Sequence, residues 1–331
     1  MFLSQNGKYK ICNKFMTKKI FLTGHTGFIG EGIIRRFKSE ESIEKHYLQK
    51  QKKYCLEFNY VDLNNYLGQW KKLLEDTDCV IHCAGRAHII NETIAGSFSK
   101  FHKINTESTR ILAEEAAEAG VKRLIFLSSV GVNGVSTDKS KSFSYDDVPA
   151  PTENYAISKF EAEKALWKVS KKTGLEIVII RAPLVYGEKM KGNFLRLINL
   201  IDKGFIFPFS NVKNLRSFIG LDNLVDLIVC CINHPKAVGH TFLASDGEDI
   251  STPDLIRKLS NAMDKFPRLL PFPISLIKLM GNIFNKSSEI DRLLNSLTID
   301  DTYTREILSW KPPFSLDDGL FKTVQWYLDN R

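Results

Sequence analysis

One stretch near the N-terminus decides the fold: residues 18–32, which read KKIFLTGHTGFIGEG. Its apolar residues Ile20–Leu22 predict a short strand. Gly24, Gly27 and Gly30 predict a tight turn, because a residue without a Cβ atom tolerates the backbone angles that such a turn needs. A helix after the turn directs unpaired N–H groups and its positive dipole end toward it. This arrangement suits a pyrophosphate and predicts a dinucleotide-binding unit; a glycine-rich turn without a ligand is the alternative.

The composition is that of an ordinary globular chain. Of 331 residues, 43% are hydrophobic and 25% are charged, which allows one large core or two modest ones. The formal net charge is +8, but the lysines are scattered or lie in predicted loops, and we find neither a basic helix with interleaved aromatic residues nor zinc-finger spacing. We therefore expect no nucleic-acid partner, and the positive charge favours an anionic small substrate.

Cysteine usage predicts a reducing compartment. The six cysteines show no framework of paired spacings; they are Cys12, Cys55, Cys79, Cys83, Cys230 and Cys231. Cys79 and Cys83 lie in an apolar stretch and are expected to be small core residues. This usage is typical of a cytoplasmic protein. No cluster of His, Cys and Asp has the spacing of metal ligands, so we expect no metal.

Two segments bear on targeting and membranes. Residues 1–17 are polar and lysine-rich, and we expect a disordered extension rather than a signal peptide, since a long apolar run and a small-residue cleavage site are missing. The most apolar later stretch, residues 274–284, is interrupted by Lys278 and is too short to span a bilayer. It predicts a buried or interfacial helix, and we expect no membrane span.

The rest of the chain alternates predicted strands and helices, which indicates an α/β fold, a doubly wound parallel sheet with helices on both faces. After the first strand, further strands are predicted at residues 45–49, 57–61, 79–83, 123–127 and 176–180. Helices are predicted from the glycine turn to about Phe37, at 107–119 and at 155–172, the last two closed by Gly120 and Gly174. Another helix is predicted to begin with Thr252 as its cap and Pro253 at its first position.

Nucleotide cofactors bind such sheets at the carboxyl ends of the strands, so the residues at those ends are the candidates for a site. In strand order they are Gly24–Gly30, Lys50–Lys53, Asp62, Ala84–Arg86, Ser128-Ser129 and Pro183.

Tyr155 and Lys159 carry the predicted chemistry. They are four residues apart at the start of a long helix and therefore lie on one face. A free tyrosine has a pKa near 10, and we expect the nearby ammonium to lower it so that the phenol can exchange a proton with a sugar oxygen. The hydroxyl of Ser129, at a strand end, could bind the same oxygen. The alternative is a pair that occurs by chance on a helix surface.

Four motifs together resemble those of the extended short-chain dehydrogenase/reductase family, the NAD-dependent epimerases and dehydratases. They are Gly24-His-Thr-Gly-Phe-Ile-Gly30, Ser128-Ser129, Tyr155-x-x-x-Lys159 and Arg181-Ala-Pro-Leu-Val-Tyr-Gly187. Within the family, residues 82–88, 192–195 and 216–226 resemble the UDP-glucose 4-epimerase-like branch. They are particularly similar to enzymes that reduce a UDP-4-keto-6-deoxy-N-acetylhexosamine to UDP-N-acetylquinovosamine in surface-polysaccharide (O-antigen or capsule) biosynthesis.

The resemblance implies a role for each matching residue. The implied catalytic residues are Ser129, Tyr155 and Lys159. The implied cofactor-binding residues are Gly24, Thr26, Gly27, Phe28, Ile29, Gly30, Asp62, Leu63, Ala84, Gly85, Arg86, Asn105, Tyr155, Lys159 and Pro183. The implied substrate-binding residues are Ser129, Tyr155, Asn193, Arg216 and Arg292, the arginines because a guanidinium fits phosphate oxygens. His82 is expected to be a core residue, whereas His88 could contact the substrate.

The resemblance also implies how the chain divides into domains. A Rossmann-type cofactor domain would span residues 18–183 with a return at about 217–244, and a smaller nucleotide-sugar domain would use about 184–216 and 245–331. Relatives often form homodimers through the helices near Glu107 and Tyr155, which this sequence permits.

The cofactor and the reaction stay open between alternatives. NAD-specific turns usually carry an acid about 20 residues on, but residues 47–53 hold no acid and three lysines, which favours NADPH over NADH. A reductase consumes its cofactor, whereas an epimerase retains it, so this favours a 4-ketoreductase over a UDP-glucose or UDP-N-acetylglucosamine 4-epimerase with retained NAD. The remaining alternative is a non-catalytic dinucleotide-binding regulator.

Overall fold

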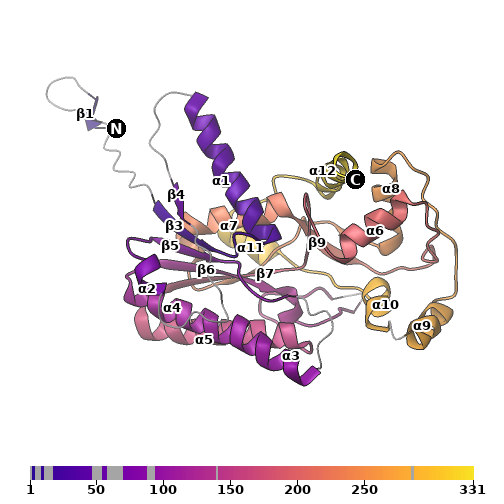
Figure 1. The fold of residues 1–331 in the computed structure, drawn as a ribbon, viewed down its shortest axis with the longest axis horizontal. Coiled ribbons are helices and arrows are strands. Elements are labelled where there is room, and N and C mark those ends of the chain that lie inside the picture. The colour runs from indigo at the N-terminus through magenta and orange to yellow at the C-terminus, as the bar shows by residue number, and fades with distance from the viewer. Residues whose placement is uncertain are drawn as a thin grey trace.

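The computed structural model describes residues 2–3, 9–10, 18–46, 54–57, 70–87, 94–138, 141–284 and 287–331 (Figure 1). Near the N-terminus, β1 (Phe2–Leu3) pairs antiparallel with β2 (Tyr9–Lys10). The rest of the described chain forms a large parallel sheet between two helical layers and a smaller sheet with helices of its own.

The large sheet has six strands in the order β10-β7-β6-β5-β3-β4, all parallel. They are β3 (Lys18–Thr23), β4 (Tyr54–Glu57), β5 (Cys79–His82), β6 (Arg123–Ser129), β7 (Glu176–Ala182) and β10 (Thr241–Leu243). Each parallel pairing requires a crossover, which the intervening helices provide. The predicted doubly wound α/β fold is confirmed.

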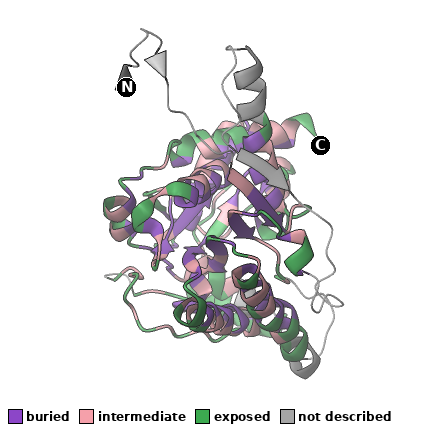
Figure 2. Ribbon diagram, turned by 90° about the vertical axis from the view of Figure 1, so that its left-hand side faces the viewer, coloured by how far each residue is buried: buried purple, intermediate pink, exposed green. Residues whose placement is uncertain are grey.

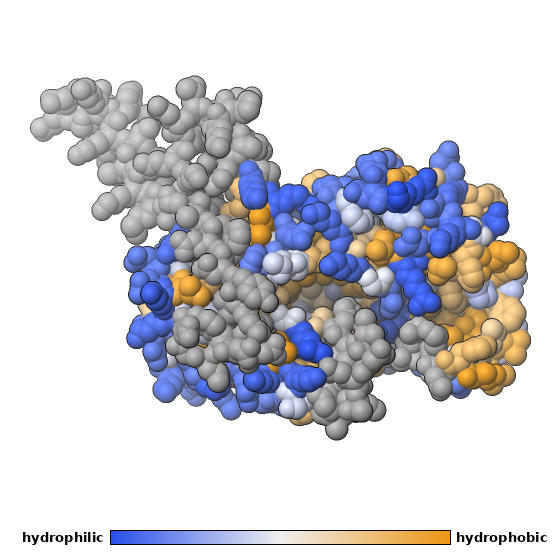
Figure 3. Space-filling model, in the orientation of Figure 1, coloured by the Kyte–Doolittle hydropathy of each residue, from blue (hydrophilic) through white to orange (hydrophobic). Residues whose placement is uncertain are grey.

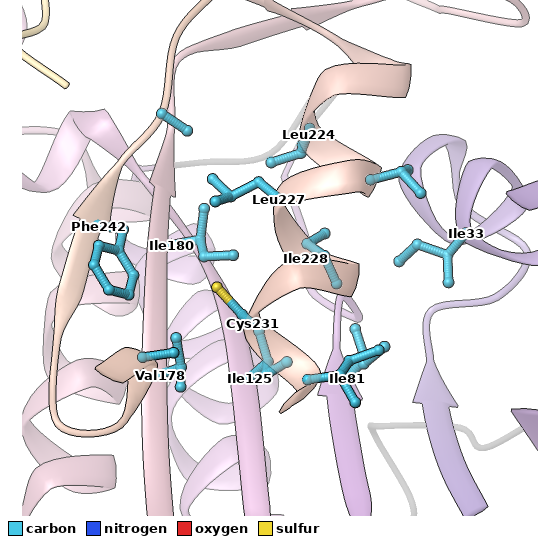
Figure 4. Close-up of a cluster of buried hydrophobic side chains, with 14 of the residues drawn as sticks. Ile33, Ile81, Ile125, Val178, Ile180, Leu224, Leu227, Ile228, Cys231 and Phe242 are labelled. Atoms are coloured by element: carbon cyan, nitrogen blue, oxygen red, sulfur yellow. The ribbon is translucent and has the colours of Figure 1, made fainter. Parts of the chain in front are cut away.

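Alternate side chains along the strands supply the two cores. Ile20 and Leu22 point to one face, which α1 (Phe28–His46) and α7 (Leu221–Asn233) cover, while Phe21 points to the other. Figure 4 shows the first core, where Ile33 of α1 and the α7 residues Leu224, Leu227, Ile228 and Cys231 meet strand residues such as Ile81, Ile125 and Ile180. The second face is covered by α2 (Trp70–Leu73), α4 (Ser108–Glu118) and α5 (Asn154–Thr173). Burial on both faces explains the near-continuous apolar strands, buried at the centre of Figure 2.

The smaller sheet has the order β11-β9-β8. Its strands are β8 (Leu184–Tyr186), β9 (Arg216–Gly220) and β11 (Asp249–Ile250). Its core is shared with α6 (Asn193–Asp202), α8 (Thr252–Ala262) and α12 (Leu316–Asp329). The remaining elements are α3 (Ile94–Phe101), the π-helix η1 (His102–Glu107), the 3₁₀ turns η2 (Val130–Val132) and η3 (Pro235–Ala237), α9 (Ile274–Ile283), α10 (Ser287–Leu294) and α11 (Thr302–Leu308).

Several predicted boundaries are confirmed and three are wrong. Gly120 and Gly174, with φ of +81° and +80°, follow the ends of α4 and α5 as predicted. The first helix, however, does not end near Phe37, and the strand at 45–49 is wrong, because α1 continues to His46. Residues 38–46 read KSEESIEKH, mostly helix-forming residues without Gly or Pro, so nothing there ends the helix. The cap of α8 is Ser251 rather than Thr252: its hydroxyl accepts from the N–H of Asp254 at 3.1 Å.

Other predictions fall partly or wholly outside the described residues. Of the strand predicted at 57–61, only Glu57 is described, as the end of β4, which lies directly beside β3. Of the predicted extension at 1–17, only β1 and β2 are described. The segment 50–53, with the lysines that motivated NADPH, has no described geometry.

The apolar stretch 274–284 forms α9; of the two expectations for it, the buried helix is wrong and the interfacial helix stays a prediction. Only Ile277 and Gly281 of this helix are buried. The reason is that α9 packs mainly against the short helix α10, where Gly281 faces Ile290, and reaches neither of the two sheets' cores. Among the helices that the structure describes, none combines the length and the apolar character needed to cross a membrane.

Candidate active site

The glycine turn joins β3 to α1 and leaves no room for a Cβ atom at Gly24 or Gly30. Gly24 has φ +76°, and its carbonyl accepts from the N–H of Gly27 at 2.9 Å. A Cβ atom on Gly30 would lie 2.1 Å from the Gly24 carbonyl oxygen, and one on Gly24 would lie 2.6 Å from the N atom of Ala84. Thr26 is exposed at the tip, and Phe28 and Ile29 pack partly into the core at the start of α1. The turn therefore presents bare backbone at the N-terminus of α1, as a pyrophosphate site requires.

The loop after β5 is tied to α5 by one asparagine. Asn105 accepts from the N–H of Arg86 at 2.8 Å and donates to the Arg86 carbonyl at 3.0 Å. It also donates to the hydroxyl of Ser158 on α5 at 2.9 Å. Asn105 is buried in η1, a π-helix, an irregularity that is frequent at functional sites. These bonds fix the segment Ala84–Arg86 beside the glycine turn.

His82 is a core residue, as predicted. Its ring is buried at the end of β5 and is bonded to the hydroxyl of Thr23 at 2.6 Å and to that of Thr109 at 2.8 Å. Burial, with a smaller contribution from the Lys159 charge, lowers the pKa of His82 to about 3. The ring is therefore neutral at pH 7 and joins β3, β5 and α4 structurally. Cys79 is likewise buried, as predicted, while Cys83 is half-buried.

Lys159 lies buried beneath the ends of two strands. Its ammonium donates to the Leu127 carbonyl at 2.9 Å and lies 4.4 Å from the centre of the Phe126 ring. A Cβ atom on Gly85 would lie 3.3 Å from Nζ, so the ammonium borders the loop after β5. Burial lowers the pKa of Lys159 to about 8, with the charges of Cys83 and Glu163 opposing the shift. The side chain is thus mostly charged at pH 7 and close to titration.

Tyr155 is half-buried at the start of α5, with its ring 6.1 Å from that of Phe101. Burial raises the pKa of Tyr155 to about 12. The expectation that the Lys159 ammonium lowers the pKa of Tyr155 is therefore wrong for the protein without substrate or cofactor. The reason is that the Leu127 carbonyl and the Phe126 ring hold the ammonium, while removal from water penalises the phenolate. Within the described ranges, no hydrogen bond reaches the Tyr155 hydroxyl, which leaves it available to a substrate.

Ser129 ends β6 next to the first turn of α5. Its hydroxyl accepts from the N–H of Gly131 at 3.1 Å, and a Cβ atom on Gly131 would lie 3.3 Å from the Cβ of Ala156. Pro183 is buried just after the neighbouring strand β7. The structure thus brings Ser129, Tyr155 and Lys159 to the carboxyl edge of the large sheet, where the glycine turn also lies.

Two arginines from the smaller sheet and α10 reach the same edge. Arg216 on β9 donates to the Arg292 carbonyl at 2.8 Å, and Arg292 pairs with Glu153 at 2.5 Å. Glu153 precedes Tyr155 by two residues at the N-cap of α5. Burial and the neighbouring Arg292 charge lower the pKa of Arg216 to about 10. The Arg216 guanidinium, which burial and the neighbouring Arg292 charge disfavour, is well placed to gain from a bound diphosphate.

Not every predicted site residue joins this group. Asn193 is exposed at the first position of α6, and among the described residues no hydrogen bond joins it to the other candidates. Asp62, Leu63 and His88 lie outside the described residues.

Sequence reasoning missed a buried ion pair behind the site. Two guanidinium nitrogens of Arg181 on β7 donate to the Glu163 carboxylate on α5, Nε at 3.0 Å and Nη2 at 2.6 Å. Ser128 donates to Glu163 at 2.5 Å, and Asn133 accepts from Arg181 at 3.0 Å. The spacing offered a signal, because Tyr155, Lys159 and Glu163 recur every four residues on one helix face.

The sheet order and the glycine turn at the end of β3 define a Rossmann-type fold, in which dinucleotides bind at the carboxyl ends of the strands. The model of the NAD dependent epimerase/dehydratase family matches residues 20–244, and the chain belongs to this family. The predicted family membership is confirmed.

Known relatives agree with this assignment. The chain is 41% identical over 319 residues to the UDP-glucose 4-epimerase of Vibrio cholerae, covering 95% of this chain and 96% of the relative. It is 23% identical over 325 residues to the N-acetyl-α-D-glucosaminyl-diphospho-ditrans,octacis-undecaprenol 4-epimerase of Escherichia coli O157:H7, covering 94% and 96%. The crystal structure of UDP-glucuronic acid 4-epimerase from Bacillus cereus in complex with NAD has a TM-score of 0.71 at 22% identity, covering 94% of this chain and 99% of that one.

Proposed function

We propose that this protein is an NAD(P)-dependent enzyme that oxidises and reduces C4 of a UDP-sugar, with 4-epimerisation as its most strongly supported reaction. The observation that carries the proposal is the free hydroxyl of Tyr155 at the sheet edge, one helical turn from the buried ammonium of Lys159. The relative at 41% identity, named as a UDP-glucose 4-epimerase, supports epimerisation.

The residues present fit a dinucleotide. The turn Gly24–Gly30 leaves no space for a Cβ atom at its two most crowded positions, so a diphosphate can approach the backbone N–H groups at the start of α1. Gly85 and Asn105 lie next to the Lys159 ammonium, and we propose that the nicotinamide ribose binds there. When bound, the cofactor would supply the hydride acceptor and donor for C4. We propose residues 18–183 and about 217–244 as the cofactor domain.

The nucleotide part of the substrate would be held by the smaller domain, which we propose as about 184–216 and 245–331. Arg216 and Arg292 lie at its border with α5 and supply two cations for a diphosphate. Asn193, at the start of α6, is proposed as a further nucleotide-binding residue on the basis of the resemblance. In this proposal the sugar would lie against the first turn of α5.

Proton transfer at the sugar falls to the chain's own residues. Tyr155 would take the proton from the sugar O4 when C4 is oxidised and return it when C4 is reduced. Ser129, one strand end away, would donate a hydrogen bond to the same oxygen. Lys159 would keep a positive charge beneath the site that stabilises the phenolate once substrate and cofactor exclude water.

A 4-ketoreductase acting on a UDP-4-keto-6-deoxy-N-acetylhexosamine is the second candidate. The resemblance of residues 192–195 and 216–226 to such reductases supports it. The three lysines in residues 47–53 no longer do, because they precede β4, whereas the ribose of a bound cofactor would lie beyond the carboxyl end of that strand, after Glu57. Both reactions use the same Tyr155 and Lys159. A role in surface-polysaccharide synthesis and a homodimer formed through α4 and α5 are parts of the same proposal.

An assay without added cofactor separates the candidates. Purified protein is incubated with UDP-glucose or UDP-N-acetylglucosamine, and the products are resolved by chromatography and NMR. Appearance of the galacto isomer, together with NAD released on denaturation, supports the epimerase. No isomer but oxidation of NADPH or NADH with a UDP-4-keto sugar supports the reductase, and the ratio of kcat/KM for the two donors tests the NADPH preference. Failure of both reactions in a folded protein that binds NAD and NADP would refute the catalytic proposal.

A further inference from the structure

The surface around α9 is apolar where a helix of a globular protein is usually polar. Residues 266–284 read FPRLLPFPISLIKLMGNIF, in which the only charged residues are Arg268 and Lys278. The exposed residues of α9 follow the i, i+3, i+4, i+7 spacing that normally faces a core: Leu276, Leu279, Met280 and Ile283. The apolar stripe of this helix therefore points to solvent.

Neighbouring segments extend this surface. Phe207 pairs with Leu269 as an isolated bridge, which brings the chain at 205–210 beside 266–270. In residues 266–270 alternate side chains are exposed, and in the neighbouring segment Phe205 and Ile206 are both exposed. Phe266 is 88% exposed, Ile283 67% and Phe284 65%. We call the whole surface the α9 patch; its members are Phe205, Ile206, Phe266, Leu270, Leu276, Leu279, Met280, Ile283 and Phe284. Figure 3 shows hydrophobic residues gathered at the right-hand end of the molecule, where Figure 1 places α9.

The two segments that carry the patch contain cations only, while the nearest acids along the chain are Asp202 and Asp264 just outside them. Residues 203–213 and 266–284 contain no Asp or Glu. Their charged side chains are Lys203, Lys213, Arg268 and Lys278, and all four are exposed. Arg268 stands between the exposed Phe266 and Leu270 on one edge. Exposed apolar segments whose own charged residues are all cations are typical of segments that lie in the interface of an anionic membrane.

We propose that the α9 patch docks the protein on the surface of a bilayer that contains anionic phospholipid. The apolar stripe of α9 enters the boundary between headgroups and acyl chains, and the four cations contact the headgroup phosphates. The alternative occupant, a second copy of this chain, is disfavoured by charge. A two-fold contact pairs a surface with itself, so it would bring the cations of both copies, Arg268 and Lys278 among them, into one interface whose two segments supply no acid to pair with them.

The place of the patch gives docking a consequence for the proposed site. Gly281 of α9 packs against Ile290 of α10, and α10 carries Arg292, which pairs with Glu153 beside Tyr155. Docking would thus hold the substrate-binding side of the protein next to the membrane surface. The docking proposal itself does not depend on catalysis, since it can be tested by binding alone.

Vesicle flotation tests the proposal with the full-length protein. Vesicles contain phosphatidylglycerol and phosphatidylcholine in equal parts, or phosphatidylcholine alone. We expect the protein to float with the anionic vesicles, and to bind less as salt is raised. Leu279→Asp with Ile283→Asp should lower the partition coefficient at least about tenfold, because two apolar side chains are lost from the interface. Arg268→Glu with Lys278→Glu should lower it by a similar factor on anionic vesicles.

Matched controls separate docking from general effects. Val148→Asp with Phe321→Asp changes exposed apolar residues outside the patch, and Lys122→Glu with Lys236→Glu changes exposed lysines outside it. Both controls should bind as the wild type does, and circular dichroism with thermal unfolding verifies that every variant is folded. The proposal is overturned if the folded wild type does not float, or if patch and control variants lose binding equally. It is also overturned if sedimentation velocity shows a dimer that the Leu279→Asp, Ile283→Asp variant abolishes while vesicles bind neither protein.

Discussion

Breaking the buried ion pair between Glu163 and Arg181 should destabilise the protein far more than breaking an exposed pair of the same kind. The side chains are 2% and 6% exposed, and the guanidinium binds both carboxylate oxygens. In Glu163→Gln the shape is kept, but the Arg181 charge stays buried without its counter-ion. Removing one partner of a buried pair costs about 3–5 kcal/mol.

The double variant measures how much of that cost belongs to the pair itself. Glu163→Met with Arg181→Met removes both charges, so no uncompensated ion remains in the core. We expect its loss of stability to be smaller than the sum of the losses in Glu163→Met alone and Arg181→Met alone, with a coupling energy of about 2 kcal/mol or more. The hydroxyl of Ser128 and the amide of Asn133 each lose a partner, so recovery will be incomplete.

Urea unfolding followed by far-UV circular dichroism gives the free energies. The matched control is Glu114→Gln, which breaks an exposed pair with Arg110 in which both side chains are 46% exposed; this should cost no more than about 0.5 kcal/mol. A second readout is kinetic. The Glu163 charge raises the pKa of Lys159, so Glu163→Gln should shift the alkaline limb of the pH–rate profile to lower pH. A loss of stability no larger than that of Glu114→Gln would refute the reasoning.

Three further predictions concern the candidate site. Tyr155→Phe should lower kcat by about 10²–10⁴ with an unchanged melting temperature, because only proton transfer is lost; steady-state kinetics that show wild-type turnover would contradict it. Lys159→Met should abolish activity yet stabilise the ligand-free protein at pH 7. Burial lowers the pKa of Lys159 from 10.5 in the unfolded chain to about 8 in the folded protein. Below pH 8 the folded wild type holds a buried ammonium, which destabilises it. As the pH rises from 8 to 10.5 this destabilisation disappears, because the folded and then the unfolded state lose the proton. The gain, measured by thermal unfolding, should therefore shrink between pH 8 and pH 10; a gain that grows there would be inconsistent. Arg292→Ala should raise KM for the UDP-sugar at least about tenfold, whereas Arg196→Ala, an exposed arginine on α6, should not; equal effects on KM would remove Arg292 from the site.

The sequence by itself determined the parallel sheet, the glycine turn and the four-residue spacing of Tyr155 and Lys159. These features follow from local rules: the apolar run of a doubly buried strand, the steric demand of a turn, and the periodicity of a helix. It also placed His82 in the core, because a histidine inside an apolar strand is surrounded on both faces. It failed at the end of α1, where a polar helix continues without a stop signal in the sequence.

Tertiary structure alone decided the electrostatics and the surfaces. Burial raises the pKa of Tyr155, and the Lys159 ammonium does not offset this because the Leu127 carbonyl and the Phe126 ring of β6 hold it. The buried partner of Glu163 lies 18 residues away on β7. The apolar stripe of α9 faces solvent although its pattern is that of a core helix. Each of these depends on which elements pack together, and spacing along the chain does not record that.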